Sequence, residues 1–223
     1  MSQALPTITY RPPMEPLRVL YEDPHLLVLD KPSGLLSVPG RGPGHEDCLA
    51  SRVQACYPDA RVVHRLDMAT SGLIVMARGR EMERTLSISF QQRRVQKRYV
   101  AVVAGRLDAP TGEVALALST DWPNRPRQKV DAEAGKASLT SYCLLAHDPL
   151  SDTSRVELTP HTGRSHQLRV HMQAIGHPIL GDELYAPPEH RAAASRLLLH
   201  ATRLELPHPG CGRTLRMESS PPF

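Results

Sequence analysis

The segment His64-Arg65-Leu66-Asp67-Met68-Ala69-Thr70-Ser71-Gly72 stands directly before the apolar run Leu73 to Ala77. A short apolar run of this kind is typical of a buried strand, so the polar residues before it form a loop that enters the sheet. Asp67 follows Arg65 by two residues and precedes two hydroxyl side chains, and such neighbours favour an ionised carboxylate in a partly dry site. We interpret Asp67 as a nucleophile or base. The alternative is that Asp67 only stabilises a turn.

The sequence on both sides of this loop predicts more strands than helices. We expect strands at 19–21, 26–30, 72–77, 99–103, 138–146, 155–158 and 197–206, and helices at 47–57, 80–93 and 167–175. Asp47 is the expected N-cap of the first helix, and arginines gather at the end of the second. Most connections are too short for β-α-β crossovers. The prediction is an α+β fold with a mixed, largely antiparallel sheet flanked by helices, over residues 17–223, after a proline-rich N-terminal arm at 1–16.

The composition is that of a globular protein. The chain has 223 residues, of which 40% are hydrophobic and 22% charged. No apolar run approaches the roughly 18 residues of a bilayer span, and the N-terminus lacks a secretory apolar region, so we expect a cytoplasmic protein without membrane association. The cysteines form no C-x-x-C pair and are expected to be free thiols; they are Cys48, Cys56, Cys143 and Cys211.

Basic residues are concentrated in one segment. The net charge is +4, but residues 78–98 alone hold seven basic residues against two glutamates. Such a run favours a polyanionic partner, and the scarcity of aromatic residues indicates that a nucleic acid would be held mainly through its phosphates. Two alternatives remain: the arginine-rich composition reflects a GC-rich genome, or the arginines only complement a helix C-terminus. The candidate phosphate contacts are Arg93, Arg94, Lys97 and Arg98.

Two further segments carry candidate site residues. In the strand that begins at Lys97, alternation places Lys97 and Tyr99 on one face, where Tyr99 either packs in the core or lines a site. The segment 163–171 combines Arg164 and Arg169 with several histidines at the start of a predicted helix. The histidine spacings of five or six residues do not match zinc sites on helices, so no metal is expected.

Several motifs together resemble the RluA family of pseudouridine synthases. They are Lys31 to Leu35, the His64 to Gly72 segment, Phe90 to Gly105, Thr162 to His171, Gly176 to Asp182 and Leu198 to Ala201, and the likeness extends from Val19 to Met217. The segment Asp121 to Val130, which contains the tryptophan, resembles the branch of that family that modifies both a 23S rRNA hairpin and tRNA anticodon loops.

The resemblance implies the pseudouridine synthase fold and an isomerisation that breaks the N1–C1′ bond of a uridine and forms a C5–C1′ bond, without cofactor or metal. It implies that Asp67 is the essential aspartate, Tyr99 the active-site tyrosine and Arg164 the basic partner of Asp67. Arg65 would fill the gap left by a flipped uridine, and Leu199 would pack against the flipped base. Arg169 joins the expected RNA contacts. The expected partner is structured RNA, the expected state is a monomer, and no S4-type RNA-binding domain is expected.

Three other functions are compatible with parts of the sequence. A glycosidase or nucleosidase also attacks an anomeric carbon, but it needs a second carboxylate beside Asp67. A non-catalytic RNA-binding or ribosome-assembly protein would not need Asp67, Tyr99 and Arg164 together. A metal-dependent nuclease would lose its activity in EDTA, whereas a pseudouridine synthase would not. A pseudouridine synthase of the same family that acts on a single different RNA site is the nearest alternative.

Overall fold

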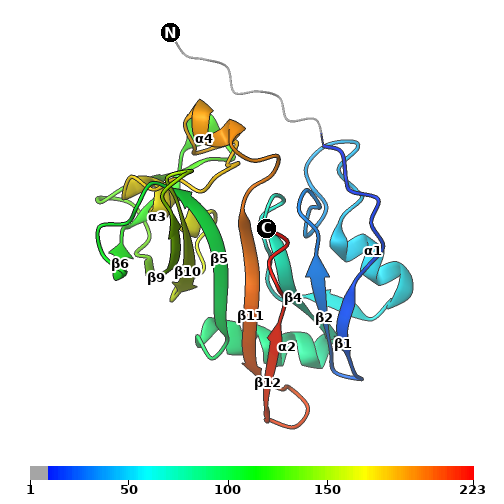
Figure 1. Ribbon diagram of the computed structural model, residues 1–223. Helices are drawn as coiled ribbons and strands as arrows, with labels where there is room; N and C mark the ends of the chain where they lie inside the picture. Colours follow the sequence, from blue (N-terminus) through cyan, green and yellow to red (C-terminus); the bar gives the residue numbers. More distant parts are fainter. Residues whose placement is uncertain (1–9) are drawn as a thin grey trace.

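The computed structural model describes residues 10–223 as an α+β fold built on one large sheet (Figure 1). The strands of this sheet are β1 (Val19–Glu22), β2 (Leu26–Lys31), β3 (Ala60–Val62), β4 (Ser71–Arg78), β5 (Gln96–Ala104), β6 (Thr111–Ala115), β9 (Leu139–Asp148), β10 (Thr153–Pro160), β11 (Leu199–Pro207) and β12 (Thr214–Glu218). A separate two-stranded hairpin is formed by β7 (Leu118–Thr120) and β8 (Gln128–Val130). The helices are α1 (Leu49–Cys56), α2 (Gly79–Gln91), α3 (Gln167–Ala174) and α4 (Pro188–Ala192), with a 3₁₀ turn at Trp122–Asn124.

The sheet confirms the predicted mixed, largely antiparallel topology. Its strand order is β1-β2-β4-β11-β5-β10-β9-β6, with β3 added to β4 and β12 added to β11. All of these pairs are antiparallel except β4 with β11, which run parallel at Ser71 and Gly72. A Cβ at Gly72 would lie 2.4 Å from the Ala201 carbonyl oxygen, and its φ is +107°, so only glycine fits this close approach. Gly72, the last residue of the His64 to Gly72 motif, therefore lies where β4 pairs with β11. This pair connects strands β1, β2 and β4 to the rest of the sheet.

The core lies between the sheet and its flanking helices. The four strand residues Leu26 to Leu29 and all of Leu73 to Ala77 are buried, as their continuous apolar sequence indicates. The α2 helix crosses the lower half of the sheet in Figure 1 and packs on β4 and β3, while α3 packs near β10. These positions leave the loop before β4 facing the start of α3.

The predicted elements are all present, with corrections at the start of the first helix and at the end of the second. The first helix begins after Cys48, whose thiol accepts the Ser51 N–H, so Asp47 is not the N-cap and instead pairs with Arg52 at 2.7 Å. The second helix ends at Gln91, and its last turn holds no basic residue. Arg93 follows it in a left-handed conformation, with φ 57°. The strands that were not predicted, β3, β6, β7, β8 and β12, are short or alternate with exposed residues, so their apolar pattern is weak.

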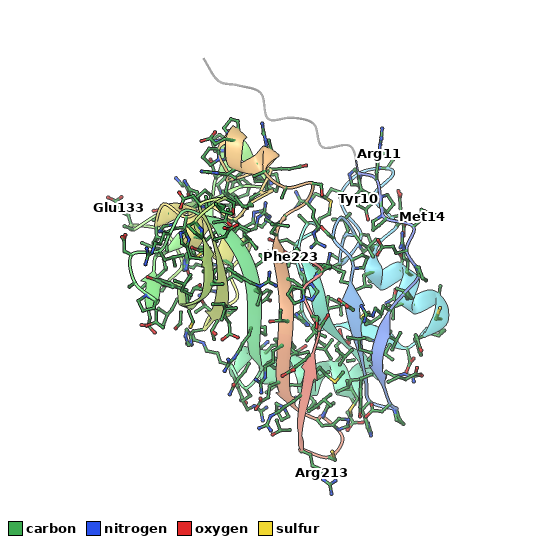
Figure 2. The ribbon with its side chains drawn as sticks, viewed as in Figure 1. Tyr10, Arg11, Met14, Glu133, Arg213 and Phe223 are labelled. Atoms are coloured by element: carbon green, nitrogen blue, oxygen red, sulfur yellow. The ribbon has the colours of Figure 1, made fainter. Side chains whose placement is uncertain are left out.

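Both ends of the described chain pack on the domain (Figure 2). The predicted arm at 1–16 lies partly outside the described residues. Within it, the Tyr10 hydroxyl donates to the Asp47 carbonyl at 2.7 Å, and Arg52 donates to the Pro13 carbonyl at 2.8 Å. At the other end, Arg155 donates to the Phe223 carbonyl at 2.9 Å. None of the helices in residues 10–223 has the length and apolarity needed to cross a membrane.

Candidate active site

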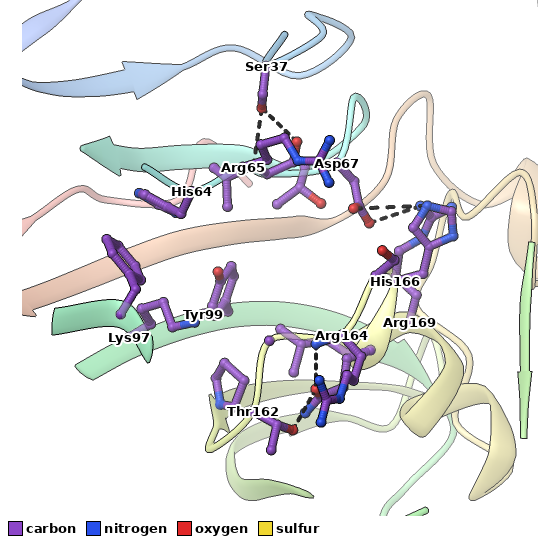
Figure 3. Close-up of a pocket in the computed structure, with 18 of the residues that line it drawn as sticks. Ser37, His64, Arg65, Asp67, Lys97, Tyr99, Thr162, Arg164, His166 and Arg169 are labelled. Atoms are coloured by element: carbon purple, nitrogen blue, oxygen red, sulfur yellow. Dashed lines mark hydrogen bonds and ion pairs between the residues drawn. The ribbon is translucent and has the colours of Figure 1, made fainter. Parts of the chain in front are cut away.

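An open cleft of about 750 Å³ lies between the loop before β4 and the start of α3 (Figure 3). This volume lies within the usual range for small-molecule pockets, roughly 300–1,000 Å³. Predicted site residues from four separate segments line it: Arg65, Asp67, Arg93, Lys97, Tyr99, Arg164, Arg169 and Leu199. The fold therefore brings most of the candidate residues to one place, although they are spread over more than half of the chain.

The loop that carries Asp67 is held by side chains of the Lys31 to Ser37 segment. The Ser37 hydroxyl donates to the Leu66 carbonyl at 2.6 Å and accepts the Leu66 N–H at 3.1 Å. The Ser33 hydroxyl donates to the Ala69 carbonyl at 2.6 Å. The loop backbone is thus fixed on both sides of Asp67, which keeps the carboxylate in one position.

Lys31 is the third anchor of this loop, and it is fully buried. Its ammonium donates to the carbonyls of Pro32, Leu35 and Met68 at 3.0, 2.7 and 3.0 Å. Burial lowers the pKa of Lys31 to about 7, while the nearby Asp67 carboxylate acts in the opposite direction. Through these three bonds to backbone carbonyls, Lys31 connects the Lys31 to Leu35 segment with Met68, the residue after Asp67.

Asp67 pairs with Arg169 (Figure 3), which is itself held by Asp182. Arg169 Nη1 lies 3.2 Å from Asp67 Oδ2, and Arg169 Nε and Nη2 donate to the two oxygens of Asp182 at 2.8 and 2.7 Å. The side chains of Arg169 and Asp182 are 5% and 1% exposed, whereas that of Asp67 is 25% exposed. Burial lowers the pKa of Arg169, but the hydrogen bonds and charge of Asp182 outweigh burial and raise it. The guanidinium is therefore a fixed cation facing a carboxylate that is open to the cleft.

This geometry corrects the expectation that Arg164 is the partner of Asp67. Arg164 lies at the wall of the cleft and donates to the Ala137 carbonyl at 3.3 Å. It also corrects the role expected of Arg169, because a guanidinium buried between two carboxylates has no surface for an RNA phosphate. The reason is local: α3 begins only at Gln167, so Arg169 in its first turn faces the cleft floor, while Arg164 precedes the helix.

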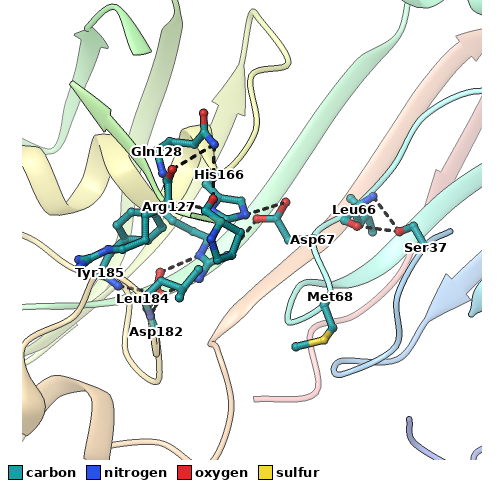
Figure 4. A network of polar contacts seen from close by, with 12 residues as sticks. Ser37, Leu66, Asp67, Met68, Arg127, Gln128, His166, Asp182, Leu184 and Tyr185 are labelled. Atoms are coloured by element: carbon teal, nitrogen blue, oxygen red, sulfur yellow. Dashed lines mark hydrogen bonds and ion pairs between the residues drawn. The ribbon is translucent and has the colours of Figure 1, made fainter. Parts of the chain in front are cut away.

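His166 is a second neighbour of Asp67 that the sequence did not single out. Its Nε2 lies 3.9 Å from Asp67 Oδ1, and its Nδ1 lies 2.6 Å from the Tyr185 hydroxyl (Figure 4). The Tyr185 hydroxyl accepts the Gln128 N–H at 2.8 Å, so its own proton is free to be donated to His166 Nδ1. Burial lowers the pKa of His166, which favours the neutral ring. When Tyr185 donates to Nδ1, the neutral ring carries its proton on Nε2, on the side of Asp67.

The backbone at His166 is strained. With φ 54° and ψ 16° it is left-handed, a conformation that is uncommon for a residue other than glycine. The hydrogen bond to Tyr185 and the contact toward Asp67 hold this conformation, as is common for strained residues at functional sites. Nothing in the sequence indicated that His166 lies beside Asp67. The sequence showed only a histidine directly before the predicted helix.

Tyr99 and Lys97 extend from β5 into the cleft, as strand alternation predicted. The Tyr99 hydroxyl makes no hydrogen bond to any residue in the described part of the chain, so it is available to a bound molecule. Burial and the charge of Asp67 raise the pKa of Tyr99, so the hydroxyl stays protonated at neutral pH. Leu199, on the adjacent strand β11, is buried and adds an apolar surface to the same wall.

The candidate phosphate contacts divide into two groups. Arg65 and Arg93 are exposed and line the cleft, whereas Arg94 is exposed but lies outside it. Arg98 lies on the opposite face of β5 from Tyr99 and pairs with Glu157 at 2.9 Å. The structure therefore places Arg98 away from the cleft.

The arrangement suits chemistry by a carboxylate that faces an open cleft. Asp67 supplies the anion, Arg169 stabilises its charge, and Tyr99 offers a ring and a hydroxyl beside it. Within residues 10–223, no second carboxylate lines the cleft with Asp67, and a glycosidase of the usual type would need one. Asp182 is buried behind Arg169, and its oxygens already accept hydrogen bonds from Arg169 and from the Leu184 N–H, so it cannot be that second carboxylate. The geometry favours reaction at a base or sugar that enters the cleft beside Asp67.

Comparison with known proteins agrees with this chemistry. Residues 25–174 match the RNA pseudouridylate synthase family. The dual-specificity RNA pseudouridine synthase RluA of Escherichia coli K12 is 53% identical over 215 residues, which cover 96% of this chain and 98% of that protein. The RluA of Pasteurella multocida is 50% identical over 217 residues, covering 97% and 99%. The structure of human RNA pseudouridylate synthase domain containing 1 is similar with a TM-score of 0.78 and 29% identity, covering 94% of this chain and 87% of that one.

The matched region contains the loop that carries Asp67, the strand that carries Tyr99 and the helix that carries Arg169. The fold, the cleft and the sequence relatives thus lead to the same conclusion. The chain belongs to the RluA family of RNA pseudouridine synthases.

Proposed function

We propose that this enzyme converts specific uridines to pseudouridine in two kinds of structured RNA, a 23S rRNA hairpin and the tRNA anticodon loop. The dual-specificity enzymes named RluA, to which the chain is about half identical over nearly its whole length, support the two substrates. The segment Asp121 to Val130 supports the same branch of the family. We further propose that residues 1–16 are an arm beside a catalytic domain at 17–223, and that the enzyme acts as a cytoplasmic monomer.

The observation that carries this proposal is the set of contacts around Asp67. In the proposed mechanism, the target uridine leaves its RNA stack and enters the cleft, and Arg65 at the cleft edge occupies the vacated place. The uracil ring lies between Tyr99 and Leu199. Asp67, kept anionic by Arg169, acts on the sugar or the base, and the N1–C1′ bond breaks. The base turns and its C5 bonds to C1′, so the product has the same atoms as the substrate, and the proton released from C5 passes to N1 through the site.

The assignment of roles follows from position in the cleft. Asp67 is the catalytic anion, Tyr99 a catalytic side chain in contact with the base, and Arg169 the positioning cation. Arg164, at the wall of the cleft, is proposed to contact the RNA backbone. Arg93 and Lys97 are proposed to bind phosphates around the flipped nucleotide, because polyanion affinity depends chiefly on such contacts.

The direct test is to map pseudouridine in purified RNA after incubation with the enzyme. Pseudouridine is an isomer of uridine and adds no mass, so the readout is a base-specific carbodiimide adduct that stops primer extension. We expect stops at one uridine in a 23S rRNA hairpin transcript and at one in a tRNA anticodon stem-loop, unchanged by EDTA. Stops in only one RNA would favour a single-site enzyme. Bound RNA without any stop would favour a non-catalytic RNA-binding protein, and RNA cleavage abolished by EDTA would favour a nuclease.

A further inference from the structure

A second cavity of about 550 Å³ lies beside the catalytic cleft. Gly163, Arg164 and Ser165 line both cavities, so one short segment forms a shared wall between them. The rest of its lining comes from the β7–β8 hairpin and the loop that follows: Leu118, Ser119, Thr120, Trp122, Gln128, Lys129, Asp131, Ala134 and Lys136. The mechanism described above uses none of these side chains as a binding site.

Trp122 lies at this cavity with 67% of its surface exposed. Of the exposed large apolar side chains in residues 10–223, it is the only aromatic one. Leaving an indole ring in water forgoes the stabilisation that its burial would give. The Arg125 guanidinium lies 3.8 Å from the ring centroid and covers one face. The exposed fraction shows that much of the remaining ring surface is free to stack on another flat group.

The segment that carries Trp122 is well ordered by its own hydrogen bonds. The Asp121 N–H donates to the Arg127 carbonyl, and the Arg127 N–H donates to the Asn124 carbonyl, both at 3.0 Å. The Asn124 side chain donates to the Asp121 carboxylate at 2.9 Å. The next residue of the hairpin, Gln128, donates its N–H to Tyr185, which contacts His166 in the catalytic cleft. The ring is therefore held at a fixed place relative to Asp67.

The charges of the second cavity suit a phosphate. Lys129, Lys136 and Arg164 line it, and Asp131 is the one carboxylate among its lining residues. Asp131 is already engaged by the Ser119 hydroxyl at 2.8 Å and the Ala134 N–H at 2.9 Å, with Lys129 at 3.9 Å. Neither Lys136 nor Arg164 is within ion-pair distance of a carboxylate in the described part of the chain. These two cations are available to an anion from outside.

We propose that this cavity binds a second nucleotide of the RNA substrate, with its base stacked on Trp122 and its phosphate held by Lys136 and Arg164. The occupant is RNA because the cavity combines a stacking surface with cations and continues the wall of the catalytic cleft. The nucleotide lies near the target uridine along the strand, since Arg164 serves both cavities. This proposal rests on the proposed function, in which the catalytic cleft takes a uridine of structured RNA.

The test measures binding of an anticodon stem-loop RNA by an Asp67→Asn enzyme, in which no turnover disturbs equilibrium. Adding Trp122→Ala should weaken the affinity by about 5- to 100-fold, the usual effect of losing one base–aromatic stack. Trp122→Phe keeps a stacking ring and should stay within about threefold of the parent. Leu150→Ala removes another exposed apolar side chain far from both cavities and should change nothing.

A series of stem-loop RNAs, each lacking one base near the target uridine, identifies the nucleotide. Removing the base that stacks on Trp122 should weaken binding to the parent enzyme but not further weaken binding to the Trp122→Ala enzyme. Unchanged affinity of Trp122→Ala, or a loss that is the same for every RNA in the series, would overturn the proposal.

The same data separate this proposal from the proposed function. If the wild-type enzyme forms pseudouridine and no base couples to Trp122, the second site is wrong and the function stands. If RNA binds with that coupling but no pseudouridine forms, the second site stands and the catalytic function is wrong. If no RNA binds, both are wrong.

Discussion

Arg169 and Asp67 are 102 residues apart in the sequence, yet Arg169 Nη1 lies 3.2 Å from Asp67 Oδ2. The same guanidinium makes a bidentate contact with Asp182, so it is fixed before any RNA arrives. Arg169 therefore presents a fixed positive charge to the Asp67 carboxylate, which is itself open to the cleft. The ion pair thus determines the position of the carboxylate that meets the substrate.

Asp67→Asn should abolish pseudouridine formation and leave RNA affinity within a few-fold of the wild type. The amide keeps the size of the carboxylate but cannot act as an anion. The measurement is single-turnover product formation beside a filter-binding isotherm. Asp152→Asn, in the turn between β9 and β10, is a matched control that changes the same group far from the cleft and should be fully active. Product at more than a tenth of the wild-type rate from Asp67→Asn would contradict the catalytic assignment.

Arg169→Met should strongly reduce the single-turnover rate at saturating RNA. Without the guanidinium, Asp67 loses the cation that lies 3.2 Å from its carboxylate and holds it in place. The change also leaves buried Asp182 unpaired, which should cost about 3–5 kcal/mol in the free energy of unfolding.

Arg164→Met is the matched control for Arg169→Met, because Arg164 does not touch Asp67. It should weaken RNA binding and leave the single-turnover rate at saturating RNA within a few-fold of the wild type. Both variants are compared by urea unfolding and by single-turnover rates at saturating RNA. A strong loss of rate in Arg164→Met and a normal rate in Arg169→Met would restore Arg164 as the partner of Asp67.

The sequence predicted Arg164 as the partner of Asp67, whereas the structure places Arg169 there, and this difference shows which features residue patterns do not predict. The apolar periodicity predicted nearly every long strand and helix, because each of these elements buries a recognisable face. The loop motif identified Asp67, strand alternation put Tyr99 on one face with Lys97, and the family resemblance assigned Tyr99 to the site. Which arginine of the 163–171 segment faces Asp67 depends on the left-handed turn at His166 and on where α3 begins, and neither is encoded in residue spacing.

Contacts between distant segments were equally hidden. Asp182 ends the Gly176 to Asp182 motif and Tyr185 follows it, and nothing in their neighbourhood indicates that they hold Arg169 and His166. The buried Lys31 was visible only as part of a family motif, because a lysine in a sequence is ordinarily expected at the surface. Tertiary packing alone determines these partners.

Tyr99→Phe should retain RNA affinity and reduce the single-turnover rate strongly. The ring still stacks on the base, and only the hydroxyl is lost. Because the pKa of Tyr99 is raised, its hydroxyl stays protonated through the neutral range, so the variant should keep the wild-type shape of the pH–rate profile between about pH 6 and 9. If Tyr99→Phe is as fast as the wild type while Tyr99→Ala is inactive, the ring matters and the hydroxyl does not.

Tyr185→Phe should lower the rate at saturating RNA more than it weakens RNA affinity. The hydroxyl is the hydrogen-bond partner of His166 Nδ1, and its loss removes the contact that orients the ring toward Asp67. The half-buried Gln128 N–H also loses its acceptor, at a cost of about 1 kcal/mol in the free energy of unfolding. Tyr57→Phe, whose hydroxyl bonds Glu22 outside the cleft, is the control. A variant that is destabilised but catalytically normal would assign Tyr185 a structural role only.

The last prediction concerns how the enzyme holds the RNA backbone. Arg93 lines the cleft, while Arg98 lies on the other face of β5 and pairs with Glu157. Each phosphate contact adds about 0.7–0.9 to the slope of log affinity against log salt, because binding releases counterions. Arg93→Ala should therefore reduce that slope by about this amount and weaken the rRNA hairpin and the anticodon stem-loop by similar factors, with little change in rate at saturating RNA. Arg98→Ala should leave the slope unchanged, since its guanidinium does not face the cleft. Equal slopes for Arg93→Ala and the wild type would mean that Arg93 stays solvated, and a reduced slope for Arg98→Ala would mean that RNA reaches the opposite face of the sheet.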